Sequence, residues 1–177
     1  MADNIVVEYK TELLKAICGC KEAVDIIDSQ SPTFDKTDPY SLIANSKGEG
    51  NLYTWLKIPK TITRADCYIL VSVQFRNITQ RNPTFGRYRV GIRLLCHDAR
   101  MPYTKANGNR LDLLYGVLKT LFEQNPNFGV NRLEMNSRIE DSYDETFNVI
   151  EMEFFTDDLR YPVSPSGKPW RQDYYGQ

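Results

Sequence analysis

The sequence has very few of the residues on which metal centres and many active sites depend. Among 177 residues there are one histidine and four cysteines. The single His97 leaves any metal site dependent on carboxylates or thiolates. The cysteines fit neither a zinc ribbon nor a Cys-x-x-Cys redox motif, because they stand at positions 18, 20, 67 and 96. We therefore expect free thiols, with Cys67 and Cys96 packed as small apolar residues inside strands.

The chain also lacks a charge excess and a long apolar run. Its 22 Lys and Arg residues and 23 Asp and Glu residues give a net charge of -1, which predicts no global attraction to nucleic acid. No apolar run reaches the length of a membrane span, and the N-terminus has no apolar core of a signal peptide. We expect synthesis in the cytoplasm and no membrane partner.

No motif in the chain predicts a reaction. The glycines at 48, 50 and 86 match neither a Walker loop nor a dinucleotide fingerprint. Cys96 and His97 are adjacent on a predicted strand, so their side chains point to opposite faces and do not form a catalytic pair. Carboxylates cluster at 140–145 and 151–158 and could serve a metal-dependent nuclease, but a solvated acidic turn is the preferred interpretation. We expect no enzyme, no cofactor and no metal.

Periodicity predicts an α/β (α+β) fold with about four strands backed by two main helices. Residues 4–28 are typical of a helix that breaks near Gly19 and continues as a short second helix. Strands are predicted at 66–76 and 87–97, joined by a polar hairpin loop at 77–86. In the first strand one face is apolar, and the other, with Tyr68, Leu70, Ser72 and Gln74, is expected to be partly polar. A helix follows to about Asn125, with Asn109 or alternatively Asn107 as its N-cap. The last two strands are predicted at 129–138 and around 149–154, in a mixed, mostly antiparallel sheet.

Two segments fall outside this pattern. Residues 30–62 have many turn signals and then the bulky Tyr53 and Trp55, which either cap one end of the core or lie against a partner. Residues 159–177 combine prolines with Tyr161, Trp170, Tyr174 and Tyr175. We interpret them as an extended C-terminal arm that docks on a neighbouring subunit, the alternative being a flap folded on its own sheet. Residues 1–158 then form one domain.

Arginines and carboxylates are separated along the chain. The arginines concentrate at 76–93, and the carboxylates concentrate in the last strand and the turn before it. If these strands are neighbours, the charges pair across the sheet. If they lie on opposite sides of the subunit, they make complementary head-to-tail surfaces that close into a ring. We prefer the second interpretation, in which Arg89 and Arg93 lie at a subunit interface.

The order of these segments resembles a phage protein family. Its parts are the strand DCYILVSVQF, the strand YRVGIRLLCHDA leading into the helix GNRLDLLYGVLKTLF, and the closing segment RLEMNSRIEDSYDETFNVIEMEFFTDDL. Over residues 5–158 this pattern resembles the tail-terminator and tail-completion proteins of tailed bacteriophages. The long 30–62 segment and the C-terminal arm depart from the compact pattern of that family.

The resemblance implies a virion structural protein of the tail or neck that is assembled in the host cytoplasm. It implies a hexameric ring that caps the tail tube, joins it to the head-connector proteins and lets DNA pass through its lumen without specific binding. The candidate subunit-interface residues are Trp55, Arg89, Arg93, Trp170 and Tyr174. The alternatives are another neck or connector adaptor and, from a different class, the metal-dependent nucleic-acid enzyme.

Overall fold

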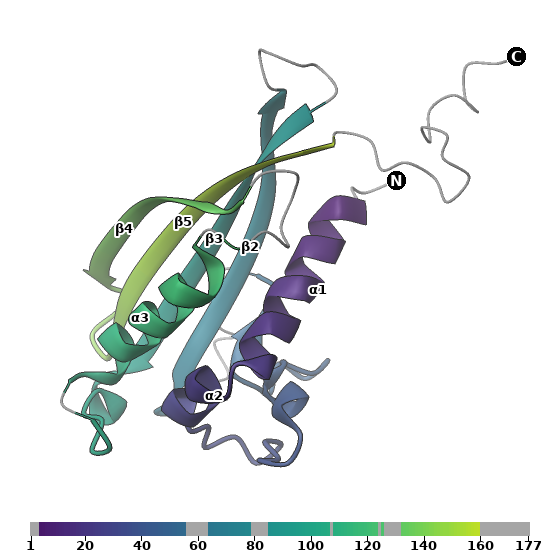
Figure 1. Cartoon of the computed structure of the whole chain (residues 1–177). Coiled ribbons are helices and arrows are strands. Elements are labelled where there is room, and N and C mark those ends of the chain that lie inside the picture. The colour runs from purple at the N-terminus through teal and green to yellow at the C-terminus, as the bar shows by residue number, and fades with distance from the viewer. Residues whose placement is uncertain are drawn as a thin grey trace, which may run out of the picture.

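The structure is a computed structural model, and it describes residues 4–55, 64–78, 85–106, 108–123, 125 and 132–159. Three helices lie on one face of a five-stranded sheet whose strand order is β1-β2-β3-β5-β4 (Figure 1). All strand pairs are antiparallel except β1 with β2. The elements are α1 (Asn4–Gly19), α2 (Lys21–Ile27), β1 (Leu52–Tyr53), β2 (Cys67–Ile78), β3 (Phe85–His97), α3 (Arg110–Phe122), β4 (Glu134–Ser142) and β5 (Phe147–Leu159), with 3-10 turns η1 (Pro39–Leu42) and η2 (Asp98–Arg100). The predicted fold class is confirmed.

The helix boundaries follow from local signals in the sequence. The chain breaks at Cys20, which is extended (φ -87°, ψ 96°), so α1 and α2 are separate helices as predicted. Asn109 begins α3 as its N-cap, because its side-chain oxygen accepts a hydrogen bond from the Asp112 backbone N–H at 2.7 Å. The helix ends at Phe122, earlier than the predicted end near Asn125, with the Glu123 backbone already extended.

The main core lies between the sheet and the helices. Alternate residues of the long strands point toward the helices, as the period-two pattern predicted. They are buried together with the apolar stripes of α1, α2 and α3. The strand contribution comes from Ile69, Val71, Val73, Tyr88, Val90, Ile92, Leu94, Ile150, Met152 and Phe154. The sheet and the helices thus form a two-layer α/β domain, and this cluster is its main core.

The second face of the sheet, opposite the helices, is more buried than the sequence predicted. Tyr68 and Leu70 were expected on a partly polar face, yet both have no exposed surface. They pack with Tyr53, Leu95 and Val149 in a separate apolar cluster. Tyr53 belongs to β1, which pairs in parallel with β2 at Ile69 and Leu70. Thus the long 30–62 segment adds a strand and covers this face at one end, and the capping interpretation holds for Tyr53.

Three predicted boundaries of strands and turns were wrong. Strand β2 continues to Ile78, and strand β3 already begins at Phe85. The hairpin loop between them is therefore shorter than the predicted 77–86. The third predicted strand, at 129–138, is instead β4 at Glu134–Ser142. The turn between β4 and β5 was predicted from residue 140, but it begins after Ser142. The acidic residues at 140–141 pair with β5 and are still part of β4.

The predicted C-terminal arm lies outside the described residues from residue 160 onward, and Leu159, predicted as its first residue, is the last residue of β5. Strand β5 runs through Leu159, opposite Phe85 of β3, and the N-terminal end of α1 lies at the same end of the molecule (Figure 1). Within the described part of the chain, none of the helices has the length and apolar character needed to cross a bilayer.

Truncating Leu70 tests the burial of the second face. Because its side chain is fully buried, Leu70→Ala should lower the free energy of unfolding by about 2–5 kcal/mol, as for a core leucine. Ile139 is 55% exposed, and Ile139→Ala should change that energy by less than about 0.5 kcal/mol. Urea unfolding measures both. Equal, small effects would show that the second face is solvated at Leu70.

Candidate functional site

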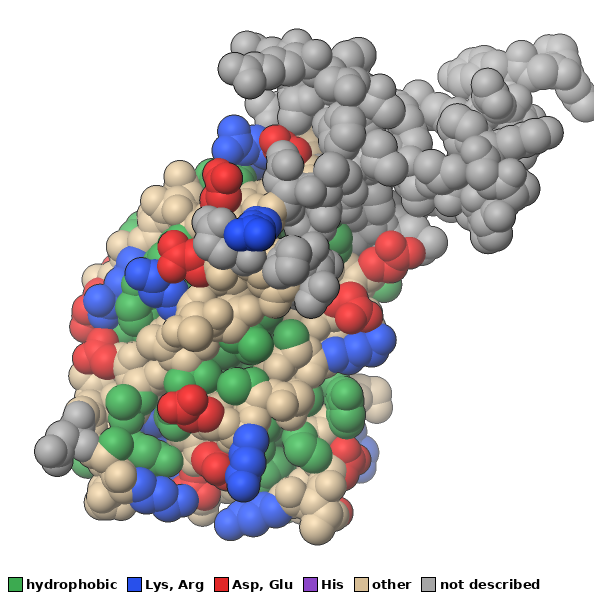
Figure 2. Space-filling view, viewed as in Figure 1, with side chains coloured by type: hydrophobic (Ala, Val, Ile, Leu, Met, Phe, Trp, Pro, Cys, Tyr) green, Lys and Arg blue, Asp and Glu red, His purple; other side chains and the backbone are tan. Residues whose placement is uncertain are grey.

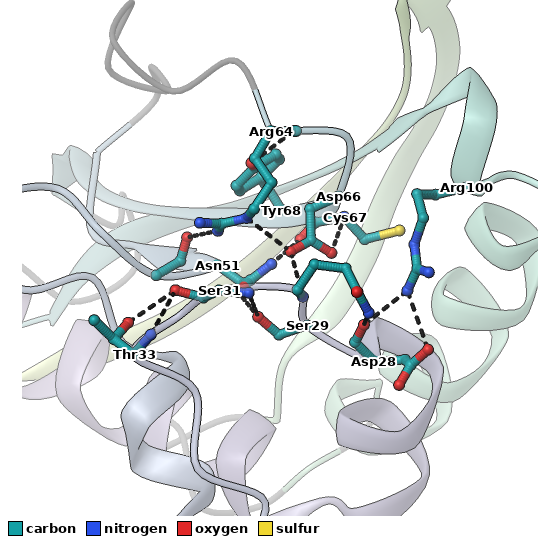
Figure 3. Close-up of polar contacts among 12 residues, drawn as sticks. Asp28, Ser29, Ser31, Thr33, Asn51, Arg64, Asp66, Cys67, Tyr68 and Arg100 are labelled. Carbon is teal, nitrogen blue, oxygen red and sulfur yellow. Dashed lines mark hydrogen bonds and ion pairs between the residues drawn. The ribbon is translucent and has the colours of Figure 1, made fainter.

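A buried set of polar side chains fastens the long 28–55 segment to the end of the sheet (Figure 3). We call Ser29, Asn51, Arg64 and Asp66 the anchor cluster. Asp66 directly precedes β2 and has no exposed surface. Its carboxylate accepts hydrogen bonds from the backbone N–H groups of Gln30 and Cys67, both at 2.9 Å. The guanidinium of Arg64 pairs with the same carboxylate at 3.2 Å. One buried charge therefore joins the chain after α2 to residues 64–67, which lead into β2.

Asn51 makes the second half of the anchor cluster. Its side-chain oxygen accepts the hydroxyl hydrogen of Ser29, and its amide donates to the Cys67 carbonyl at 2.7 Å. Its backbone also bonds Leu42 and Ile69, at 2.8 Å each. The side-chain oxygen, the side-chain amide and both backbone groups of Asn51 thus bond within the chain. Asn51 therefore holds the start of β1 beside β2.

Gly50 allows the chain to turn into this cluster. Its φ of 143° lies in a region that residues with a side chain rarely adopt. A Cβ atom at this position would lie 2.6 Å from the Ala44 Cα, in a contact that only backbone movement could relieve. The turn also gives Tyr53 a partner, because its hydroxyl donates to the Gly48 carbonyl at 2.7 Å. Burial raises the pKa of Tyr53 to about 12, so the phenol remains protonated.

Two arginines join α2 to α3 beside the anchor cluster. Arg110, only 5% exposed, donates to the carbonyls of Ile26 and Arg100 and lies 4.8 Å from the ring centre of Tyr103. Arg100 donates to the backbone carbonyl of Asp28 at 2.7 Å and pairs with its carboxylate at 3.1 Å. Asp28 ends α2 in the left-handed conformation (φ 44°). These contacts hold the helices by bonds to backbone carbonyls and present no free catalytic group.

Arginines and carboxylates form a ladder across the second face of the sheet. Strands β3 and β5 are neighbours, with Arg93 directly opposite Glu151 and their charged atoms 2.5 Å apart. Arg89 pairs with Glu153, which also accepts a hydrogen bond from Asn136 of β4 at 2.7 Å. The preferred interpretation, opposite charges on opposite sides of the subunit, is therefore wrong. The cross-strand alternative is correct, and this charge pattern is satisfied inside one chain.

The predicted interface residues are not brought together in one place. Arg89 and Arg93 lie in the ladder. Trp55 lies two residues after the end of β1 and is 45% exposed. It packs edge-on against Tyr53, with ring centres 5.2 Å apart. Trp170 and Tyr174 lie outside the described residues. Among the described candidates, Trp55 has a large exposed ring that contacts the buried Tyr53, and the interface role of all five stays a prediction.

The residues considered for catalysis have structural partners. His97 accepts a hydrogen bond from the Ala99 N–H at 3.1 Å through Nδ1 and packs edge-on against Phe147. Asp144 accepts hydrogen bonds from the backbone of Thr146 and Phe147 and from the Thr146 hydroxyl, which together lower its pKa. Among the described residues there is no group of three or more His, Cys, Asp or Glu side chains placed to hold a metal ion.

The four cysteines are free thiols in the structure. Cys67 and Cys96 face each other across β2 and β3, with their sulfurs 2.8 Å apart. Burial, with the neighbouring Cys96 thiol, raises the pKa of the Cys67 thiol. Thiolate is the reactive form of cysteine, so this pair acts as apolar packing in the core, as the strand pattern predicted.

The comparison with protein families gives the family of the chain. The YomW family model matches residues 11–156 of the 177. This protein belongs to the YomW family. The family derives from a phage gene, YomW of a Bacillus prophage. No curated protein matches the chain. The matched range contains the anchor cluster, the charge ladder and all the described elements except the first seven residues of α1 and the last three of β5.

Removing the Asp66 carboxylate should destabilise the fold strongly. Asp66→Ala leaves the Arg64 guanidinium and two backbone N–H groups without their acceptor, and we expect a loss of about 3–5 kcal/mol in the free energy of unfolding. The matched control is Glu12→Ala, which removes an exposed pair with Lys15 and should cost less than about 1 kcal/mol. Urea unfolding followed by circular dichroism compares the two. A loss near that of the control would mean that the cluster does not hold the segment.

Reversing one rung of the ladder tests whether the charges pair within a chain. Arg93→Glu places two carboxylates opposite each other on β3 and β5 and should lower the free energy of unfolding by about 1 kcal/mol. Adding Glu151→Arg restores the opposite charges and should recover most of the loss. Thermal unfolding at low salt measures the series. If the double variant is as unstable as the sum of the single variants, the pair contributes no coupling.

Proposed function

We propose that this chain is a virion structural protein of a tailed bacteriophage, a ring-forming tail terminator or completion protein. The observation that carries the proposal is its membership in a phage-derived family over residues 11–156. The fold supports it, because a small α/β domain with one sheet backed by helices is what the resemblance implied. The subunits would form a ring, expected to be a hexamer, that caps the tail tube and meets the head connector.

The side chains of the folded domain favour a structural role. Its buried charges, Asp66 and Arg110, bind backbone groups of the same chain. Asp144, the centre of the acidic turn, already accepts three hydrogen bonds from that turn. A nuclease would need such carboxylates grouped around a cation, and among the described residues no three His, Cys, Asp or Glu side chains are placed to hold one. The mechanism we propose is therefore geometric, with subunits joined by surfaces and by the C-terminal arm.

The charge ladder changes how the ring is to be tested. Glutamates at Arg89 and Arg93 would face Glu153 and Glu151 in the same chain, so a loss of oligomers could arise from a damaged fold. Trp55 avoids this difficulty, because its ring is 45% exposed. Trp55→Ala should leave the unfolding midpoint nearly unchanged. If Trp55 lies at a subunit contact, this variant should weaken self-association measured by light scattering at least about fivefold.

The proposed station is tested in the phage that encodes the chain. Mass spectrometry of purified virions should detect the polypeptide, and a nonsense mutation should yield tails of uncontrolled length or heads without tails. Expression of the wild-type chain in trans should restore infectious particles. Virions that lack the polypeptide would overturn the proposal. Magnesium-dependent nuclease activity lost in Asp141→Ala and Asp144→Ala would favour the enzyme instead.

A further inference from the structure

A hollow of about 370 Å³ lies between α2 and the start of α3. We call it the α2–α3 groove, and its walls include Lys21, Glu22, Asp25, Ile26, Tyr103 and Leu113. Ile26, Tyr103 and Leu113 give it an apolar floor, while the charged residues belong to α2. In the space-filling view of the helix-covered side, hydrophobic side chains appear between charged ones in the lower part of the molecule, where these elements lie (Figure 2).

Two carboxylates border the groove without a partner in the described part of the chain. Glu22 and Asp25 are exposed and are three residues apart on α2, so they lie on the same side of the helix. Neither forms an ion pair with another described residue, whereas the arginines and carboxylates of the ladder do. With Lys21 included, the border has one positive and two negative groups. An apolar floor with an acidic border fits a segment that presents an aromatic ring beside basic residues.

The C-terminal arm has this composition. Residues 160–177 contain Arg160, Lys168 and Arg171 against the single acidic Asp173. Trp170 stands between Lys168 and Arg171, separated from the lysine by Pro169. A tryptophan flanked by two basic residues therefore matches both parts of the groove, the apolar floor and the acidic border. Proline-rich segments also bind to apolar surfaces at a low entropic cost.

The position of the groove indicates that the arm comes from another copy. Strand β5 ends at Leu159, and the groove lies beyond the other end of the sheet, where β5 begins at Phe147 and β3 ends at His97 (Figure 1). A strand of this length, 13 residues, spans about 40 Å at about 3.3 Å per residue. Trp170 follows Leu159 by eleven positions, and eleven residues reach at most about 36–40 Å when fully extended. Trp170 of the same subunit would therefore reach the groove only with the whole arm straight along the sheet, whereas the arm of a neighbouring copy needs no such extension.

We propose that residues 168–171 of one copy bind in the α2–α3 groove of a neighbouring copy. Trp170 packs on the apolar floor, and Lys168 and Arg171 pair with Glu22 and Asp25. This contact rests on the proposed assembly and assigns it a specific pair of surfaces. Because the donor and acceptor surfaces differ, the contact is heterologous and propagates from copy to copy around a closed ring.

Photo-cross-linking in the full-length protein tests this contact. Trp170 is replaced by p-benzoylphenylalanine, which keeps an aromatic ring, and this light chain is mixed with a large excess of ¹⁵N-labelled wild-type chain before irradiation. Digestion and mass spectrometry should find the residue-170 peptide joined to residues 21–26 or 101–113, and mixed-isotope products should dominate. The same replacement at Trp55, the other tryptophan of the chain, is the control and should not label the groove.

Charge reversal tests the role of the acidic border. Glu22→Lys with Asp25→Lys should lower the yield of the groove cross-link at least about fivefold. Adding Lys168→Glu and Arg171→Glu should restore it, because the charges are then exchanged between the two surfaces. Glu8→Lys with Glu145→Lys is the matched control, since it changes the net charge equally at exposed positions and should leave the yield unchanged.

The outcomes separate this inference from the proposed function. If light scattering shows oligomers and the cross-links lie elsewhere, or join only peptides of one isotope, the groove is not the binding site for a neighbour's arm, while assembly stands. If the protein is in virions but the charge reversal has no effect, the acidic border does not recognise the arm. If virions lack the protein, the proposed function fails by itself, whatever the cross-links show.

Discussion

The buried carboxylate of Asp66 is the constraint on which the arrangement of this domain depends. It binds the backbone after α2, the backbone at the start of β2 and the Arg64 side chain. A buried charge is costly unless it is paired and hydrogen-bonded, so the chain after α2 must meet the start of β2 at this point. Asn51 extends the constraint to β1, and β1 in turn places Tyr53 over Tyr68 and Leu70. The second apolar cluster is thus buried because the anchor cluster holds β1 and Tyr53 against it.

Sequence patterns predicted the parts of the fold that depend on local or periodic signals. The Gly19 break, the Asn109 cap and the core faces of β2, β3 and β5 follow from backbone preferences and period-two alternation. The packing of β1 over Tyr68 and Leu70 could not be predicted in this way. It depends on a two-residue strand and on the hydrogen bonds made by residues 29, 51 and 66. A polar residue just before an apolar strand was the available signal for Asp66, but such residues usually lie in solvent. The pairing of the arginines required strand order, which periodicity does not contain.

The ladder on β3, β4 and β5 affects how a binding surface on this domain can form. Arg89 and Arg93 are partly shielded by Glu153 and Glu151, so the field of each pair falls off quickly with distance. Approach of an anionic partner such as DNA to this face is therefore little favoured by long-range attraction. This agrees with a chain of net charge -1 whose role in a ring would be to surround DNA without binding it. At the border of the α2–α3 groove, by contrast, Glu22 and Asp25 form no ion pair with any residue that the structure describes.

Docking of an arm in a groove would explain how a small domain without a large apolar surface could form a ring. The exposed large hydrophobic residues are scattered over the described surface, at Val7, Tyr40, Trp55, Phe75, Ile139 and Tyr143, and scattered residues do not make a strong interface. A short arm adds a second contact whose effective concentration is high once two subunits touch. Each contact can then be weak, with one buried ring contributing on the order of 2 kcal/mol. Free subunits would remain separate, and the closed ring, in which each groove and each arm is occupied, would be the stable form.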